Sequence, residues 1–186
     1  VIEEMNRLGM IVDLSHAGKQ TCIEAIEFSN KPVAISHANP TFFHKSIRNV
    51  DNDVLKQLAN KNGFIGLSLY PYHLKNLGEC TAEEFCSMIK ELINLIGEDN
   101  IGIGSDLCLN WPDDVVMWMR NGKWTKKIDY GESKDKNPKW PKLPSWYKQP
   151  SDLKNLFTTM CENNISEKVA AKIVGENWFN FMKNQF

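Results

Sequence analysis

Met10-Ile11-Val12-Asp13-Leu14-Ser15-His16 is the stretch that decides the fold, and Pro32-Val33-Ala34-Ile35-Ser36-His37 repeats its pattern further along the chain. Each is a short apolar run, rich in β-branched residues, that stops at a Ser-His pair, and such runs are typical of strands buried on both faces. Between them, the segment 19–29 places apolar residues at helical spacing, which predicts a helix that returns the chain to a parallel strand. His16 and His37 would then lie side by side at the carboxyl ends of two strands, where α/β proteins place their chemistry.

The same alternation continues along the chain and predicts an α/β fold with parallel strands. Two further buried strands are expected at Phe64–Leu69 and Ile101–Ser105, and they lead directly into Tyr70 and Asp106. A capping box at Thr81-Ala-Glu-Glu84 opens the clearest amphipathic helix. Helices are predicted over residues 1–8, 18–30, 51–62, 81–97, 152–163, 166–174 and 176–183.

Length and composition limit the classes of protein to which the chain can belong. At 186 residues and 42% hydrophobic residues it can bury one substantial core, so a single domain is expected. The 22 basic and 23 acidic residues leave a net charge of -1, so no overall field favours nucleic acid or an anionic membrane. The five cysteines form no C-x-x-C pair, which favours a reducing, cytoplasmic compartment. No apolar run reaches the roughly 20 residues of a transmembrane helix.

Residues 111–150 differ in composition from the rest of the chain. They hold five of the eight prolines and five of the six tryptophans. We interpret this insert as a long loop or lid over the rim that carries the histidines. Stacking on single-stranded nucleic acid is the alternative for such an aromatic segment, and the neutral net charge argues against it.

His16 and His37 are the strongest candidates for a metal site, because imidazole is a common zinc ligand and two strand ends can hold two rings rigidly. A single histidine at this place would be interpreted as a hydrogen-bonding cap. Two histidines in matched Ser-His contexts favour ligands. Asp106 could be a third ligand, a proton-transfer group or the N-cap of a following helix, and the sequence leaves these alternatives open.

The remaining polar candidates have weaker support from the residues alone. Arg48 could bind a substrate carboxylate in a two-pronged contact, although spacing alone favours a surface salt bridge. Tyr70 could contact substrate, although a packed aromatic at the rim is the commoner role. His44 and His73 lie in predicted loops and are expected at the surface.

Taken together, these segments resemble the membrane dipeptidase (renal dipeptidase-like) zinc peptidases. Each motif alone is weak, but they occur in family order and at family-like spacing. The insert segment Trp118–Thr125 also looks like that of some bacterial members. The matching motifs are Gly9–His16, Pro32–His37, Ser46–Asp51, Ile101–Asp106 and Gly175–Trp178.

The resemblance implies a (β/α)8 barrel with two zinc ions that hydrolyses dipeptides. His16 and His37 match two histidine ligands of the family, and Asp106 matches its proton-transfer aspartate. Arg48 matches the arginine that binds the dipeptide carboxylate, and Tyr70 matches a tyrosine that faces substrate. One departure is local: Asp106-Leu-Cys-Leu109 stands where the family usually has Asp-Phe-Asp-Gly, which puts the loop shape and the substrate preference in question.

The larger departure is that the family's His-x-Asp pair and bridging glutamate belong to an N-terminal half that these residues do not contain. Residues 1–186 are therefore expected to be the C-terminal part of one barrel domain, with 111–150 as its insert. The implied partners are a dipeptide and that N-terminal half, on another chain or in residues outside this sequence, and a homodimer is compatible with the resemblance. Another metal-dependent amidohydrolase and a non-catalytic half-barrel fragment remain the alternatives.

Overall fold

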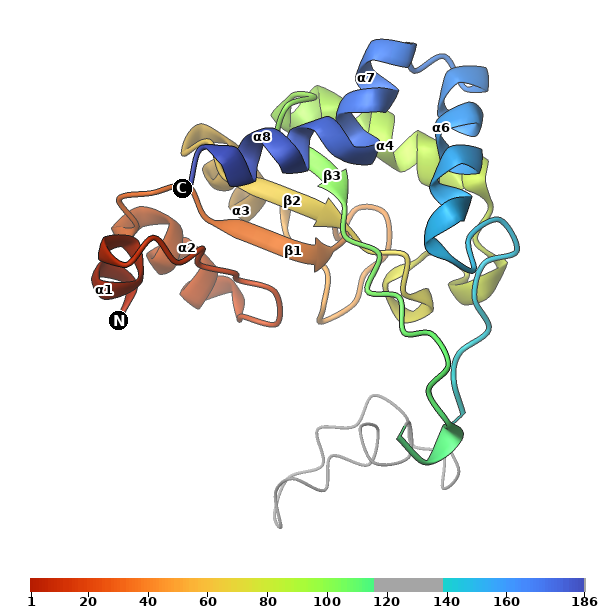
Figure 1. Ribbon diagram of the computed structural model, residues 1–186, viewed down its shortest axis with the longest axis horizontal. Helices are drawn as coiled ribbons and strands as arrows, with labels where there is room; N and C mark the ends of the chain where they lie inside the picture. Colours follow the sequence, from red (N-terminus) through yellow and green to blue (C-terminus); the bar gives the residue numbers. More distant parts are fainter. Residues whose placement is uncertain (116–138, 186) are drawn as a thin grey trace.

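A three-stranded parallel sheet lies at the centre of the structure, a computed structural model that describes residues 1–115 and 139–185. Its strands are β1 (Ala34–Ala38), β2 (Phe64–Leu67) and β3 (Ile101–Ile103), in the order β1-β2-β3 (Figure 1). Ile35 pairs with Ile65, which pairs in turn with Ile101. The predicted α/β fold with parallel strands is confirmed, although each strand is shorter than predicted.

The segment 10–14 lies beside β1 but is not a regular strand. It joins the sheet through a single parallel bridge between Asp13 and Ala34. The Leu14 amide donates to the Ala34 carbonyl at 2.8 Å, and the Ala34 amide donates to the Val12 carbonyl at 2.9 Å. Met10, at the start of the segment, is 53% exposed. The predicted parallel alignment is therefore confirmed, whereas the predicted regular strand is wrong.

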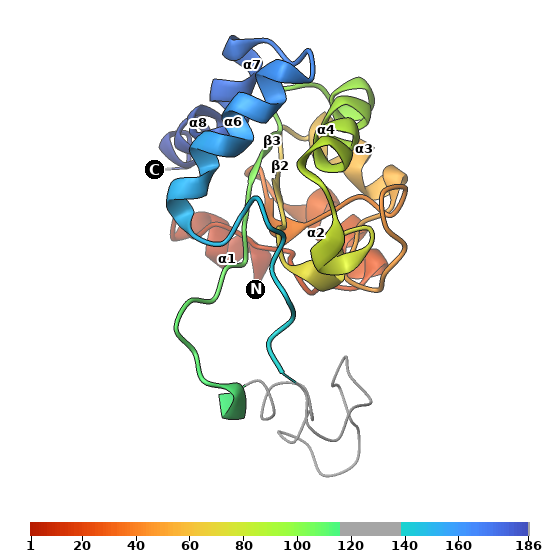
Figure 2. The same cartoon turned by 90° about the vertical axis from the view of Figure 1, so that its right-hand side faces the viewer.

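Four helices pack side by side in chain order along one face of the sheet. They are α2 (Lys19–Phe28), α3 (Asn52–Asn60), α4 (Ala82–Ile96) and α6 (Leu153–Glu162). Their apolar faces bury Leu55, Ile89 and Leu156 against Ile35 and Ile65. The predicted capping box of α4 is confirmed, because Thr81 and Glu84 exchange hydrogen bonds of 3.0 and 3.1 Å. Figure 2 shows α3 and α4 on one side of the sheet, which is seen from its edge.

The C-terminal helices cover the other face of the sheet. Here α7 (Glu167–Ala171), a π-helical segment η4 (Lys172–Glu176) and α8 (Asn177–Lys183) follow one another without a break, so the predicted separation of two helices near Gly175 is wrong. The Trp178 ring packs against the Phe64 ring at 4.2 Å between centroids. Gly102 leaves room for both rings, because a Cβ atom there would overlap them.

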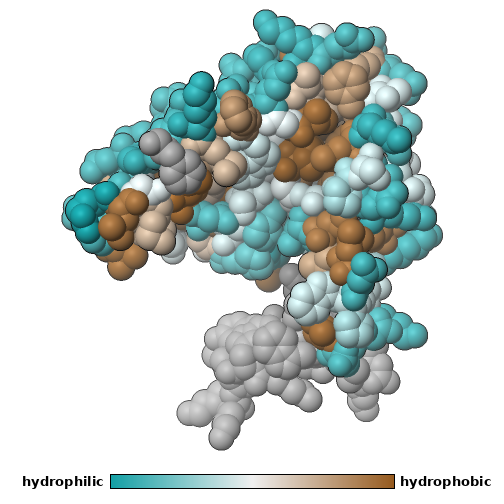
Figure 3. All heavy atoms as spheres, in the orientation of Figure 1, coloured by the Kyte–Doolittle hydropathy of each residue, from teal (hydrophilic) through white to brown (hydrophobic). Residues whose placement is uncertain are grey.

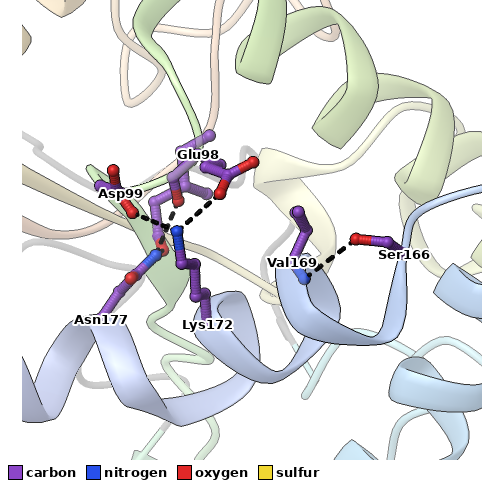
Figure 4. A network of polar contacts seen from close by, with 7 residues as sticks. Glu98, Asp99, Ser166, Val169, Lys172 and Asn177 are labelled. Carbon is purple, nitrogen blue, oxygen red and sulfur yellow. Dashed lines mark hydrogen bonds and ion pairs between the residues drawn. The ribbon is translucent and has the colours of Figure 1, made fainter.

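Polar contacts fix the start of this C-terminal unit to the end of α4 and the start of β3 (Figure 4). Lys172 Nζ forms ion pairs with Glu98 at 2.6 Å and Asp99 at 2.7 Å. The Asn177 amide donates to the carbonyls of Glu98 and Ile101 at 2.7 and 2.8 Å. The predicted cap of α7 is confirmed, because the Val169 amide donates to the Ser166 hydroxyl at 3.3 Å. The bonds of Lys172 and Asn177 fix the position of β3 relative to η4 and α8.

The sheet curls sharply at its centre. A Cβ atom on Gly104 would overlap the Ser36 carbonyl, and a Cβ atom on Gly66 would overlap the same carbonyl and approach the Gly104 Cα at 3.1 Å. In a flat sheet β1 and β3 would stand about two strand spacings apart, roughly 9.5 Å. The absence of side chains at Gly66 and Gly104 therefore allows the outer strands to fold toward each other on one face.

The remaining elements are short and lie at the rim or the chain ends. The described end of the insert packs against this rim: Trp146 Nε1 donates to the Cys80 carbonyl at 2.8 Å, and Tyr147 is 2% exposed. Residues 116–138 of the predicted lid, which include Trp118–Thr125, lie outside the described residues. The short elements at the rim and the chain ends are α1 (Ile2–Arg7), η1 (Pro71–His73), η2 (Leu77–Glu79) and η3 (Pro150–Asp152).

The surface carries both hydrophilic and apolar residues (Figure 3). Most of the face seen in Figure 3 is hydrophilic, and apolar residues gather between β3 and α6. Among the described residues, no helix is both long enough and apolar enough to span a bilayer. All five cysteines carry free thiols.

Candidate metal centre and substrate site

The two histidines predicted to be ligands converge. His16 ends the edge segment 10–16 and His37 lies on β1, and their Nε2 atoms are 3.1 Å apart. The rings meet edge to face with centroids 5.1 Å apart. Two nitrogen ligands of one tetrahedral zinc ion, each about 2.05 Å from the metal, would be about 3.3 Å apart. The observed pair therefore fits a shared cation with almost no movement.

A hydroxyl and a carboxylate behind His37 set the direction of its ring. His37 Nδ1 lies 2.8 Å from Ser36 Oγ, which lies 2.5 Å from Asp13 Oδ2. Because Asp13 can only accept, the Ser36 hydroxyl donates to Asp13, and its oxygen accepts the proton of His37 Nδ1. This fixes the tautomer in which His37 Nε2 carries a lone pair toward His16. Such an outer partner is the usual support of a metal-binding histidine.

Hydrogen bonds from Ser36 and Ser15 hold the Asp13 carboxyl in its ionised form. Burial raises the pKa of the Asp13 carboxyl, but hydrogen bonds from Ser36 and Ser15 outweigh this effect and leave the pKa below its usual value. The amides of Ser15 and Ser36 both donate to Asp13 Oδ1 at 3.0 Å. Ser15 Oγ in turn accepts from the His37 amide at 3.0 Å. The donor set is therefore two imidazoles backed by a carboxylate, which suits zinc.

His16 and Asp106 have left-handed backbone conformations, with φ of 69° and 53°. Non-glycine residues adopt this conformation rarely and at a cost of about 1–2 kcal/mol, and it is commonest where function requires it. Residues 107–112 are described and contain no helix, so the N-cap interpretation of Asp106 is wrong. Asp106 lies two residues beyond Gly104, and His37 follows Ser36, so the curl of the sheet places both at the same part of the rim.

Arg48 is only partly exposed. Its Nε and Nη2 atoms are buried. Arg48 and His16 line one cavity of about 410 Å³ between the loops that follow residue 14 and β1. Leu14, Cys22 and Val54 form part of its apolar wall. The structure thus brings a guanidinium and a candidate metal ligand to one opening.

Tyr70 lies at the exit of β2, where its ring packs against Tyr72 at 5.8 Å and His73 at 5.2 Å between centroids. His73 is 2% exposed, so its prediction as a surface residue is wrong. Burial, followed by the nearby positive charge of Arg48, lowers the pKa of His73 to about 3. A neutral imidazole is therefore built into the rim next to Tyr70.

Sequence reasoning missed three polar residues of this region: Asp13, Ser36 and His73. Two signals were present in the sequence. Asp13 interrupts an otherwise apolar run three residues before His16, and Ser36 directly precedes His37. His73 gave no comparable signal, since loop histidines are usually exposed. Among the described residues, no group of three or more histidine, cysteine, aspartate or glutamate side chains is arranged to hold a metal ion.

Comparison with known proteins identifies the family. The model of the membrane dipeptidases, peptidase family M19, matches residues 1–113, a stretch that includes all five predicted site residues. The chain belongs to this family. The resemblance drawn from the sequence motifs is thereby confirmed.

Relatives of this M19 chain support the assignment. Dipeptidase tcpJ of Claviceps purpurea is 36% identical over 142 residues, which cover 69% of the chain and 33% of the relative. An amidohydrolase from Pseudomonas aeruginosa is 31% identical, with a TM-score of 0.87 over 99% of the chain and 55% of that structure. A metallo peptidase from Rhodobacter sphaeroides, solved with a phosphinate mimic of L-Ala-D-Ala, has the same fold, with a TM-score of 0.74 at 22% identity over 100% of the chain and 45% of that structure. The M19 chain thus spans about a third to a half of the length of these proteins.

Proposed function

We propose that these residues form the C-terminal half of a (β/α)8 metallodipeptidase that uses two zinc ions. The observation that carries the proposal is the 3.1 Å approach of the Nε2 atoms of His16 and His37, with the tautomer of His37 fixed from behind. Membership of the M19 family and the names of the relatives supply the reaction class.

The half-barrel proposal is supported by the shape of the sheet. Its outer strands curl toward one face, and the helices α2, α3, α4 and α6 follow one another along the opposite face. A closed barrel needs this curvature and this outer ring of helices. The P. aeruginosa amidohydrolase, of which the chain covers 55%, supports a second half of similar size. We propose that this half supplies the remaining metal ligands.

The residues of this chain have separate roles in the proposed reaction. His16 and His37 would hold the metal, with His37 oriented by Ser36 and Asp13. When bound, zinc supplies an acidified water and polarises the scissile carbonyl. Arg48 binds the free carboxylate of the dipeptide in a two-pronged contact, which fixes the register of the peptide bond.

Two further rim residues complete the proposed mechanism. Asp106 accepts a proton from the attacking water and delivers it to the leaving amine, since the amine cannot leave as an anion. Tyr70 flanks the substrate at the exit of β2. The curl that brings the ends of β1 and β3 together supports the placement of Asp106 beside the metal ligands.

The test uses the full-length protein and measures zinc and activity separately. Elemental analysis should find about two zinc per active site. His37→Ala should lower both the zinc content and the hydrolysis of dipeptides. Asp106→Asn should keep the zinc and lose at least 100-fold in kcat, because it removes only the proton transfer. A protein that folds, binds no zinc and hydrolyses no dipeptide would be the non-catalytic alternative and would refute the proposal.

A second candidate is another metal-dependent amidohydrolase on the same fold. The name of the P. aeruginosa structure, at 31% identity, favours it. A panel of L,L and L,D dipeptides beside N-acyl amino acids separates the two. Higher kcat/KM for the N-acyl amino acids would decide for this alternative.

A further inference from the structure

A buried polar cluster joins the two loops that carry Arg48 and Tyr70. It consists of Asn39, Asn49, Ser68 and His73, and we call it the amide clamp. Asn39 and Ser68 are 0% exposed, His73 is 2% exposed, and Asn49 is half-buried. Buried polar groups are costly unless they are hydrogen-bonded, so their partners define what the cluster does.

Asn39 extends the sheet beyond β1 with its side chain. Its Oδ1 accepts from the Ser68 amide at 3.1 Å, and its Nδ2 donates to the Ser68 carbonyl at 2.9 Å. The same Nδ2 donates to the His73 carbonyl at 3.0 Å. A flipped amide would place its oxygen against two carbonyls, so the bonds determine the orientation. Asn39 therefore ties the chain after β1 to the chain after β2.

Asn49 makes the second link, directly beside Arg48. Its Nδ2 donates to the carbonyls of His44 and His73 at 2.8 and 3.0 Å, and its Oδ1 accepts from the Asn39 amide at 3.0 Å. Each bond of this side chain reaches a backbone group. The loop that carries Arg48 is thus held to the segment 70–74 through one shared acceptor, the His73 carbonyl.

The side of the clamp that faces Tyr70 is equally well defined. Ser68 Oγ accepts from the Tyr70 amide at 3.2 Å and lies 2.8 Å from His73 Nδ1. The His73 ring then meets the Tyr70 ring edge to face at 5.2 Å between centroids. Both the backbone and the ring of Tyr70 are therefore set by members of the clamp.

Apolar packing could hold either loop, but it would not fix their relative position as sharply. Hydrogen bonds are directional, and a substrate-binding group that is displaced by about 1 Å can lose a factor of about 100 in rate. Binding sites of this kind depend on such support behind the residues that touch the ligand.

We propose that Asn49 is a positioning residue for recognition of the substrate carboxylate. Through the amide clamp it holds Arg48 at a fixed place relative to Tyr70, so that the site selects peptides with a free C-terminal carboxylate. This inference rests on the proposed function, because that function supplies the substrate. Among the members of the clamp, Asn49 is the one that is adjacent to Arg48 in the sequence.

The test compares Asn49→Ala in the full-length enzyme with Asn155→Ala, a control on α6 at an exposed position. Each variant is assayed with one dipeptide and with the same dipeptide amidated at its C-terminus. For Asn49→Ala we expect KM for the free acid to rise on the order of tenfold, and KM for the amide to change less than about twofold. Zinc content should not change. A loss of general stability would instead lower kcat for both substrates in equal proportion, and that result would overturn the proposal.

Hydrogen exchange provides a readout that needs no activity. In Asn49→Ala the amides of residues 72–74 should exchange at least about tenfold faster, although no residue there is changed. Unchanged exchange in 72–74 would overturn the coupling of the two loops. If Asn49→Ala does not fold, Asn49→Ser, which keeps a small polar side chain, allows the same comparison. Coupled exchange in a protein that hydrolyses neither substrate would refute the proposed function while it supports the clamp.

Discussion

Ser36→Ala removes one hydroxyl from the line that runs from Asp13 to His37. In the native structure this hydroxyl donates to Asp13 at 2.5 Å and accepts from His37 Nδ1 at 2.8 Å. Without it, the proton of His37 is free to move to Nε2, the atom that faces His16 at 3.1 Å. Zinc binding must then drive the proton back to Nδ1 and restrict the ring.

The expected loss is therefore mainly one of metal affinity. Removal of an outer partner of a ligating histidine weakens metal binding by about 10- to 100-fold. At 25 °C this corresponds to about 1.4–2.7 kcal/mol. Folding should suffer less, because Asp13 keeps the two amide donors from Ser15 and Ser36, which Ser36→Ala does not remove.

Two measurements on the full-length protein test this reasoning. Competition with a chelator gives the zinc dissociation constant, and nitrogen NMR of the metal-free protein reports which nitrogen of His37 is protonated. Ser87→Ala is the matched control, because the Ser87 hydroxyl bonds only within its own helix, to the Glu83 carbonyl at 2.9 Å. Zinc affinity within about twofold of the native value, with His37 still protonated on Nδ1, would refute the role of Ser36.

Three further predictions concern stability. Gly104→Ala should lower the free energy of unfolding, measured by chemical denaturation, by about 1–3 kcal/mol, because the new methyl group meets the Ser36 carbonyl. The control Gly175→Ala should show no such loss, because a Cβ atom there meets nothing within 4 Å. Thr81→Ala should cost about 0.5–2 kcal/mol through loss of the capping box, measured in the same way. Burial first, and nearby charges second, lower the pKa of His73 from 6.5 to about 3, so the unfolded chain binds one more proton than the folded protein between these pH values. The free energy of unfolding should therefore fall by about 1.4 kcal/mol per pH unit as the pH drops through this window. His73→Phe should remove this contribution in denaturation experiments from pH 7 to pH 4.

Much of the fold was predictable because short-range rules determine it. The alternation of apolar runs and amphipathic segments placed the helices and β1 to β3 in the right order. The capping box at Thr81 and the cap at Ser166 depend only on neighbouring residues, and both formed as predicted. The segment 10–14 was predicted less well, since a regular strand depends on partners along its length, and this segment has one bridge to β1.

The site was predictable only in part for a similar reason. Strand ends were visible in the sequence, so His16, His37 and Asp106 could be placed on one rim. The contacts behind them come from residues far apart in the chain. His73 is an example: its ring is buried because Ser68 and Tyr70 pack around it, and its carbonyl is held by Asn39 and Asn49. None of these contacts has a local pattern.

The curl of the sheet connects the two parts of the proposed mechanism. His37 follows Ser36 on β1 and Asp106 lies two residues beyond Gly104, so the distance between the proposed metal ligand and the proposed proton acceptor depends on how closely Gly104 approaches the Ser36 carbonyl. A side chain at Gly104 would push β1 and β3 apart and would move Asp106 away from His37. The glycine thus determines more than stability, because a proton can pass only between groups within hydrogen-bond reach, about 2.6–3.2 Å or one intervening water. Since Ser36 also orients His37, one residue of β1 contributes both to the direction of the proposed metal ligand and to the spacing of the rim.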